Sequence, residues 1–175
     1  MNLSAAVAVS PFALLASVAM AGGITVEFVG GFEPAVTQRI NASGVIVGDF
    51  QFNAVTTAMR YTATEGRTPL AAPAGASQSI ATGINDLGAI VGRYSAGSGT
   101  FGALWNPDGT LVTLAAPPGT WSYSTPSNIN NPGMVCGTAT LVQVGTDPEQ
   151  AWRWTPKGGY QLLPRLGGVV AGCRD

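Results

Sequence analysis

The sequence contains no histidine, the side chain most often used as a catalytic base or metal ligand near neutral pH. A conventional Ser-His or Cys-His nucleophile pair is therefore excluded, and so is a histidine-based metal site. The Gly-x-Ser-x-Gly pattern of a nucleophile elbow is also missing. These absences argue against the most common forms of hydrolytic chemistry.

Charge is scarce as well, because only 10% of the 175 residues are charged and the net charge is −1. The eight basic residues are scattered, whereas binding to a phosphate backbone needs clustered positive charge, so nucleic acid is not an expected partner. No Asp-x-Asp-x-Asp or Gly-Gly-x-Gly-x-Asp pattern indicates a calcium site. We expect neither a metal ion nor a cofactor.

The first 21 residues lack Lys, Arg, Asp and Glu altogether. An apolar core from Phe12 to Val18 precedes Ala19-Met20-Ala21, a small-x-small pattern typical of signal-peptide cleavage. We therefore expect a signal peptide over residues 1–21, although the usual basic residues at its start are missing. A buried strand pair or a membrane anchor are the alternatives, and the short apolar span disfavours the anchor. Export predicts a secreted protein, extracellular or periplasmic, with no stable membrane span in its mature form.

Sustained helical periodicity is absent after residue 22, where Gly (24 in the chain) and Pro (12) interrupt short β-branched or aromatic segments. Such segments predict β-strands joined by tight turns. The hydrophobic fraction of 46% is high enough to offset the entropy lost on folding, so we expect residues 22–175 to form an ordered β-repeat domain.

Three copies of one pattern occupy that domain, over residues about 32–75, 76–119 and 120–168. Each has an Asn-x-x-Gly turn, then an apolar triplet and a glycine, and later a four-residue run that ends in an aromatic side chain. The turn Asn residues are 44 and 45 positions apart. The shared positions are the turn residues Asn41, Gly44, Asn85, Gly88, Asn130 and Gly133, the glycines Gly48, Gly92 and Gly137, and the aromatics Tyr61, Trp105 and Trp154.

The turn sequences indicate how each copy folds. Asn at the first position and Gly at the fourth favour a type I turn, as do Asn106-Pro107-Asp108-Gly109 and Thr155-Pro156-Lys157-Gly158. Four strands in about 44 residues is the signature of a β-propeller blade. We therefore predict an all-β chain of three four-stranded antiparallel blades, with partial strands at both ends.

Three blades are too few to close a ring, since propellers need about four to eight. The chain is therefore a fragment of a longer propeller, an open stack, or part of a ring that other chains complete. Open blade edges would favour self-association.

The repeats resemble those of the bacterial HAF-type extracellular repeat family. Ile84 to Gly92 is similar to the first family element, Gly102 to Trp105 to the second, and Leu163 to Gly168 to the third. The nearest match to the His-Ala-Phe that names the family is Gln150-Ala151-Trp152. The resemblance implies export and a propeller-like repeat architecture, and it brings no catalytic residues.

Two sets of side chains are open to alternative interpretations. The repeated aromatics could stack on sugars, but at blade spacing they more often pack between neighbouring blades. Cys136 and Cys173, the only cysteines, could form a disulfide in an exported protein. Alternatively they are two small buried apolar side chains, with Cys136 packed like Val47 and Val91.

Binding function is expected in the segments that join the second and third strands of each copy, because these segments differ between copies. They are predicted loops over residues 49–57, 93–101 and 138–150. Their candidate ligand-binding residues are Asp49, Arg93, Tyr94, Asp147 and Glu149.

The sequence favours a secreted, non-enzymatic β-repeat module that binds a ligand or protein partner of unknown identity. The alternative is a carbohydrate-active hydrolase or lyase of propeller architecture, in which Asp147 and Glu149 form the acid pair. Two carboxylates facing one bond across a cleft would be required. Clustering of these carboxylates with Arg93 or Arg153 in one cleft would favour the enzyme.

Overall fold

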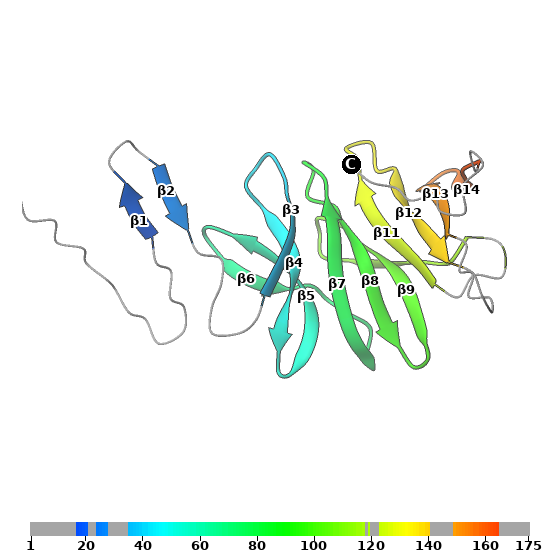
Figure 1. Cartoon of the computed structure of the whole chain (residues 1–175), viewed down its shortest axis with the longest axis horizontal. Helices are drawn as coiled ribbons and strands as arrows, with labels where there is room; N and C mark the ends of the chain where they lie inside the picture. The colour runs from blue at the N-terminus through cyan, green and yellow to red at the C-terminus, as the bar shows by residue number, and fades with distance from the viewer. Residues whose placement is uncertain are drawn as a thin grey trace, which may run out of the picture.

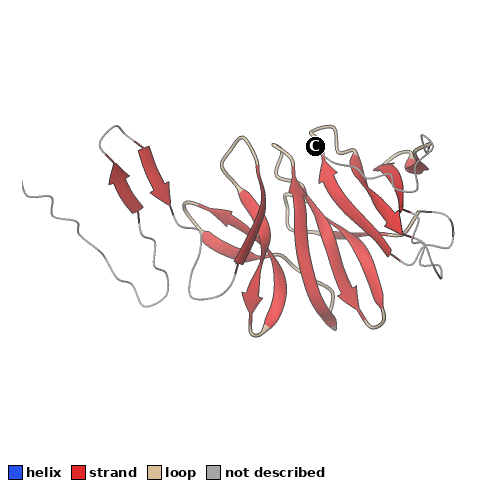
Figure 2. Ribbon diagram, in the orientation of Figure 1, coloured by secondary structure: helices blue, strands red, loops and turns tan. Residues whose placement is uncertain are grey.

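The computed structural model describes residues 17–20, 24–27, 35–117, 119, 123–140 and 149–164. Every regular element in these ranges is a β-strand, as Figures 1 and 2 show. Twelve strands form three four-stranded antiparallel sheets, none of them closed into a barrel. The predicted all-β, partially propeller-like fold is therefore confirmed. The described part of the chain contains no helix long and apolar enough to cross a membrane.

Each sheet is a meander in which strands that are consecutive in sequence pair with one another. The first sheet consists of β3 (Ala35–Ile40), β4 (Ile46–Phe52), β5 (Val55–Thr62) and β6 (Gly66–Pro69). The second consists of β7 (Ala76–Ile84), β8 (Ile90–Ala96), β9 (Gly99–Trp105) and β10 (Leu111–Leu114). The third consists of β11 (Tyr123–Ile129), β12 (Val135–Thr140), β13 (Glu149–Thr155) and β14 (Gly159–Leu162).

A separate hairpin of β1 (Ser17–Met20) and β2 (Ile24–Glu27) lies apart from the three sheets in Figure 1. The expected cleavage site after residue 21 lies between these two strands. The hairpin therefore belongs to the uncleaved chain, and its presence does not test whether cleavage occurs. Residues 1–16 and 21–23 lie outside the described ranges, as do residues 165–175, where the C-terminal partial strand was expected.

The sheets pack face to face, and the first strand of each sheet lies against the preceding sheet. Strand β7 contacts β3, β4 and β5, and β11 contacts β7, β8 and β9. Two buried clusters fill the interfaces. The first joins Val47 and Ala58 to Ile90, Tyr94 and Trp105, and the second joins Val91, Leu104 and Leu114 to Val135 and Trp152.

The repeated glycine of the second strand is explained by its neighbour in the sheet. A Cβ atom at Gly92 would overlap the carbonyl oxygen of Ile80 in β7, and Gly48 and Gly137 meet the same obstacle in β3 and β11. The first strand of each sheet bulges beside the residue that pairs with this glycine. The bulge brings one backbone too close to the other for any side chain to fit.

The Asn-x-x-Gly turns form as predicted. The Gly88 N–H donates to the carbonyl oxygen of Asn85 at 3.1 Å, and Gly88 has a φ of +85°, which favours glycine. The side-chain oxygen of Asn85 accepts a hydrogen bond from the Ala89 N–H at 2.8 Å. The other two copies repeat both bonds, so each Asn side chain caps its own turn.

These turns also connect the sheets, through a set of hydrogen bonds that we call the Asn ladder. The Nδ2 group of Asn41 donates to the carbonyl oxygen of Asn85 at 3.1 Å, and the Nδ2 group of Asn85 donates to that of Asn130 at 3.0 Å. Alongside, the N–H of Ala42 donates to Asp86 Oδ1 and the N–H of Asp86 donates to Asn131 Oδ1, both at 2.9 Å. The ladder joins all three sheets at one end of the stack, which we call the turn end.

The two proline turns differ from each other. The Gly109 N–H donates to the carbonyl oxygen of Asn106 at 2.9 Å, as expected for a β-turn. In the other turn the Gly158 N–H donates to Thr155 Oγ1 at 2.9 Å, and the positive φ falls on Gly159 (+61°). The threonine hydroxyl thus accepts the bond in place of the backbone carbonyl, and the glycine with a positive φ is Gly159, the residue after the turn glycine Gly158.

Candidate functional site

The repeated aromatic side chains are buried or packed, and Trp105, which lies between the first and second sheets, also lines one side of a pocket there. Tyr61 and Trp105 are buried, and Trp154 packs against the second buried cluster. The indole N–H of Trp105 donates to the carbonyl oxygen of Ala71 at 2.6 Å, which ties the second sheet to the segment after β6. Of the two interpretations, the geometry of the described residues fits packing.

The segments predicted as loops are mostly strand, so that part of the prediction is wrong. Strands β4 and β5 extend to a two-residue turn at Asn53 and Ala54, whose φ angles of 50° and 62° fit a type I′ hairpin. Strands β8 and β9 likewise extend to a turn at residues 97–98. Residues 141–148 lie outside the described part of the chain. We call the end of the stack with these hairpins the hairpin end.

Asp49 and Arg93 occupy the same position in consecutive sheets and interact electrostatically. Partial burial raises the pKa of the Asp49 carboxyl above its usual value, and the positive charge of Arg93 partly offsets this effect. The structure therefore couples these two candidates through their charges, from β4 of the first sheet and β8 of the second.

Of the expected acid pair, only Glu149 belongs to the described residues, because Asp147 lies outside them. Trp152 packs against the second sheet, so Glu149, three residues earlier on β13, faces the opposite side. Arg93 belongs to the second sheet, and the Nε group of Arg153 donates to Gln161 Oε1 at 2.7 Å. Among the described residues, Glu149 forms no ion pair with either arginine.

Cys136 differs from its counterparts Val47 and Val91. Both valines are fully buried between sheets, whereas Cys136 is half-buried on β12 and is disulfide-bonded. The interpretation of a free buried thiol is therefore wrong for Cys136. Cys173 lies outside the described residues.

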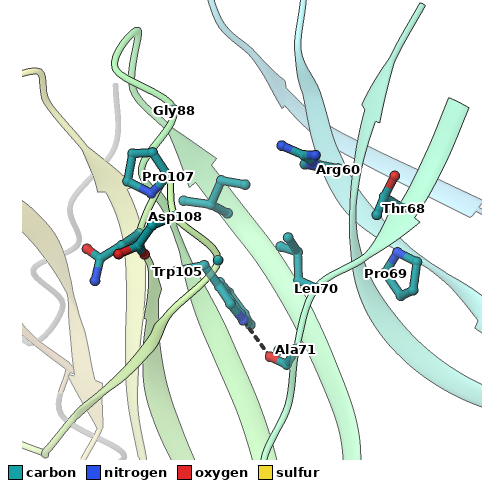
Figure 3. A pocket seen from close by; sticks show the side chains of 12 residues that line it. Arg60, Thr68, Pro69, Leu70, Ala71, Gly88, Trp105, Pro107 and Asp108 are labelled. Atoms are coloured by element: carbon teal, nitrogen blue, oxygen red, sulfur yellow. Dashed lines mark hydrogen bonds between the residues drawn. The ribbon is translucent and has the colours of Figure 1, made fainter. Parts of the chain in front are cut away.

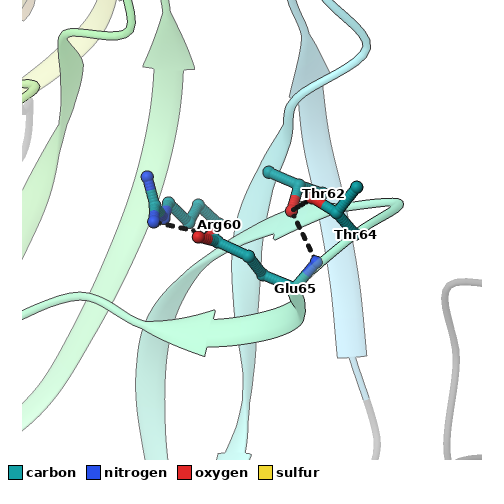
Figure 4. Close-up of polar contacts among 4 residues, drawn as sticks. All are labelled: Arg60, Thr62, Thr64 and Glu65. Atoms are coloured by element: carbon teal, nitrogen blue, oxygen red, sulfur yellow. Dashed lines mark hydrogen bonds and ion pairs between the residues drawn. The ribbon is translucent and has the colours of Figure 1, made fainter.

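One pocket lies at the turn end, between the first and second sheets, and has a volume of about 320 Å³ (Figure 3). Its charged side chains are already engaged. Arg60 pairs with Glu65 at 2.8 Å, and the backbone N–H of Glu65 is held by Thr62 Oγ1 at 3.0 Å (Figure 4). The Asp108 carboxylate accepts bonds from both the N–H and the hydroxyl of Thr110, which lower its pKa. These groups are less available to a ligand.

A second pocket, of about 410 Å³, lies at the hairpin end between the second and third sheets, and we call it the hairpin-end pocket. The start of β9, the segment after β10 and the start of β11 surround it. Its lining residues are Gly99, Thr100, Phe101, Gly102, Thr113, Ala115, Ala116, Tyr123 and Ser124. The side chains of Phe101 and Tyr123 are 39% and 51% exposed, so aromatic surface is accessible at this pocket.

Tyr94 supports this pocket from within the second sheet. It is buried, its ring stacks on Phe101 with centroids 5.4 Å apart, and its hydroxyl lies 2.9 Å from Thr113 Oγ1. Tyr94 was a predicted ligand-binding residue, but its burial assigns it a positioning role. It holds two of the residues that line the pocket.

Ser124 is a residue that sequence reasoning missed. Its counterpart in the preceding copy, Ser79, accepts a hydrogen bond from the Ala58 N–H at 2.9 Å. In the second sheet Gly102 stands where Ala58 stands in the first, and it pairs with Leu114 much as Ala58 accepts a hydrogen bond from the Leu70 N–H at 2.8 Å. Ser124 is only 4% exposed, and its Oγ is buried with no hydrogen-bond partner. The sequence gives no signal for this difference, because both copies have serine at this position.

Comparison of the chain with protein-family models, with curated proteins and with solved structures finds no match. The resemblance to HAF-type repeats stays a prediction from the sequence.

Proposed function

We propose that this chain is an exported, non-enzymatic β-repeat module that binds a ligand at its hairpin end. The three sheets act as the scaffold, and the Asn ladder holds them together at the opposite end. A rigid scaffold with a variable end is the usual arrangement for binding modules.

The main observation in support is the hairpin-end pocket, which lies where the repeat is broken. Gly102 and Tyr123, which line it, stand where the preceding interface has Ala58 and Gln78. Its volume of about 410 Å³ lies within the range of roughly 300–1,000 Å³ typical of small-molecule sites. The described residues of its lining include no Asp, Glu, Lys, Arg or Cys, so they offer surface for binding rather than groups for acid–base or nucleophilic chemistry.

The test is fragment screening by NMR on the uniformly ¹⁵N-labelled chain. Binding fragments should shift the amide signals of the hairpin-end pocket, and Ala116→Trp should abolish these shifts by filling the space. The matched control is Ala72→Trp, at the equivalent exposed position of the preceding interface. Shifts that fall elsewhere, or that survive Ala116→Trp, would contradict the proposal.

Export is the second part of the proposal, supported by the uncharged apolar segment of residues 1–21 and by the resemblance to extracellular repeats. Mass spectrometry of the exported protein should find a new N-terminus at Gly22. Secreted material that begins with Met1 would refute cleavage.

A further inference from the structure

The hairpin-end pocket combines accessible aromatic surface, hydroxyl groups and an absence of charge. We propose that it binds a small neutral saccharide unit, an inference that rests on the proposed binding function. The reasons concern charge, aromatic surface and hydrogen bonding in turn.

Charge excludes several ligand classes. The described residues that line the pocket include no Asp, Glu, Lys or Arg. A phosphate, a nucleotide, an acidic peptide or a cation would lose its hydration there without gaining a counter-charge. The ligand is therefore neutral.

Aromatic surface favours a ligand with apolar faces. Phe101 and Tyr123 are partly exposed beside the pocket, on β9 and β11 respectively. Stacking on Tyr94 fixes Phe101 in place, so binding costs little of its rotational freedom. The C–H faces of a pyranose ring can pack on such rings, as other flat apolar groups do.

Hydrogen bonding requires that the ligand also be polar. Ser124 lines the pocket and its Oγ is buried without a partner, so rotation of this side chain toward the pocket would let a ligand hydroxyl pair with it. Thr100 and Thr113 also line the pocket, and their hydroxyls pair with Ser95 Oγ and with the Tyr94 hydroxyl. Strand β10 ends opposite Gly102, so the edge of β9 at Thr100 and Phe101 extends beyond it and presents backbone groups. A ligand with both C–H faces and hydroxyls can pack on the aromatic rings and pair with the β9 backbone and with Ser124.

The experiment is isothermal titration of the mature chain with cellotetraose and xylotetraose, with trigalacturonate as the charged comparison. We expect at least one neutral oligosaccharide to bind with little salt dependence, and trigalacturonate to bind more weakly. Phe101→Ala and Tyr123→Ala should each weaken binding roughly tenfold, and Ser124→Ala should weaken it by a similar factor.

Gln78→Ala is the matched control, because Gln78 is the exposed counterpart of Tyr123 at the preceding interface, and it should leave affinity unchanged. Thermal melts of each variant separate loss of binding from loss of fold. The saccharide inference is overturned if neither neutral oligosaccharide binds at millimolar concentration, or if the three pocket variants bind as tightly as the parent chain. If fragments still shift the pocket signals and Ala116→Trp still abolishes those shifts, the proposed binding function survives. If both experiments fail, both proposals fall.

Discussion

Ser79 and Ser124 occupy the same position in consecutive copies but differ in hydrogen bonding. Both are buried, yet only Ser79 has a partner, the N–H of Ala58. Ser79→Ala should lower the free energy of unfolding by about 1–3 kcal/mol, because it leaves a buried N–H unpaired. Ser124→Ala should change it by less than about 0.5 kcal/mol or stabilise the fold, since no bond is lost. Urea unfolding of the two variants checks this contrast, and equal losses would contradict it.

The Asp86 carboxylate should make the free energy of unfolding decrease at acid pH. The N–H of Ala42 and the side chain of Asn131 hydrogen-bond to its carboxylate and hold its pKa below the usual 3.8. A depressed pKa in the folded state means that the stabilisation is complete above about pH 4 and is lost as the pH falls through the folded value. Asp86→Asn should therefore flatten the acid limb of a plot of stability against pH.

Asp49 serves as the control, because its pKa is shifted in the opposite direction to that of Asp86. Burial raises the pKa of its carboxyl, so its ionisation opposes folding once the pH exceeds the unfolded value. Asp49→Asn should stabilise the chain at neutral pH but have little effect near pH 3. Chemical unfolding at pH 3 and pH 7 distinguishes the two aspartates, and parallel pH profiles for both variants would refute the assignment.

Asn85 is the central rung of the Asn ladder and connects the second sheet to the third. It is only 5% exposed, its Oδ1 caps the turn at 2.8 Å, and its Nδ2 reaches Asn130 at 3.0 Å. Asn85→Ala removes both bonds and should cost about 2–4 kcal/mol. Asn85→Asp keeps the capping oxygen but puts a carboxylate oxygen against the Asn130 carbonyl in place of the donor, so its loss of stability is an upper limit for the bond between sheets.

The control for Asn85 is Asn106→Ala. The Nδ2 group of Asn106 bonds only within its own exposed turn, to Thr110 Oγ1 at 2.9 Å, so the loss should be below about 1 kcal/mol. Urea unfolding measures all three variants. If Asn85→Asp is as stable as the parent chain, the ladder does not contribute to sheet stacking.

The elements themselves could be predicted from sequence because their determinants are local. Asn, Pro and Gly at fixed turn positions and short apolar segments between them were enough to place twelve strands in three sheets. The hydrogen bonds that the Nδ2 groups of Asn41 and Asn85 donate to the next sheet could not be predicted, since they depend on how closely neighbouring sheets approach. The predicted loops proved to be strands because Asn53 and Ala54 accept positive φ angles in a two-residue turn.

The candidate site was harder to predict than the fold. Asp49, Arg93 and Tyr94 were proposed as ligand-binding residues but do not line the hairpin-end pocket, whereas Phe101, Tyr123 and Ser124, which do, were missed. The pocket lies between the second and third sheets, so its lining depends on how the two sheets approach each other, which no local sequence pattern predicts.

At the scale of the whole molecule, the first sheet exposes apolar side chains along its edge strand. Val36 and Ile40 on β3 are 52% and 65% exposed. An edge strand of this kind favours pairing with a second copy of the chain. We expect association that increases with concentration in sedimentation velocity, and Val36→Lys with Ile40→Lys should suppress it.

Val112→Lys is the matched control, because Val112 lies on β10, an edge strand of the second sheet, and is 40% exposed. A chain that stays monomeric at every concentration would contradict the prediction, and so would equal suppression by the control.

The Asn ladder also has a direction. In each step a backbone N–H of one copy donates to a side chain of the next copy, from Ala42 to Asp86 and from Asp86 to Asn131. Ala42 has only a methyl group where the later copies have an acceptor, so a copy placed ahead of the first would find no oxygen there. An engineered array of this unit should therefore lengthen by addition behind the third copy, with Asp or Asn at the matching turn position, and addition at the front should require Ala42→Asp first.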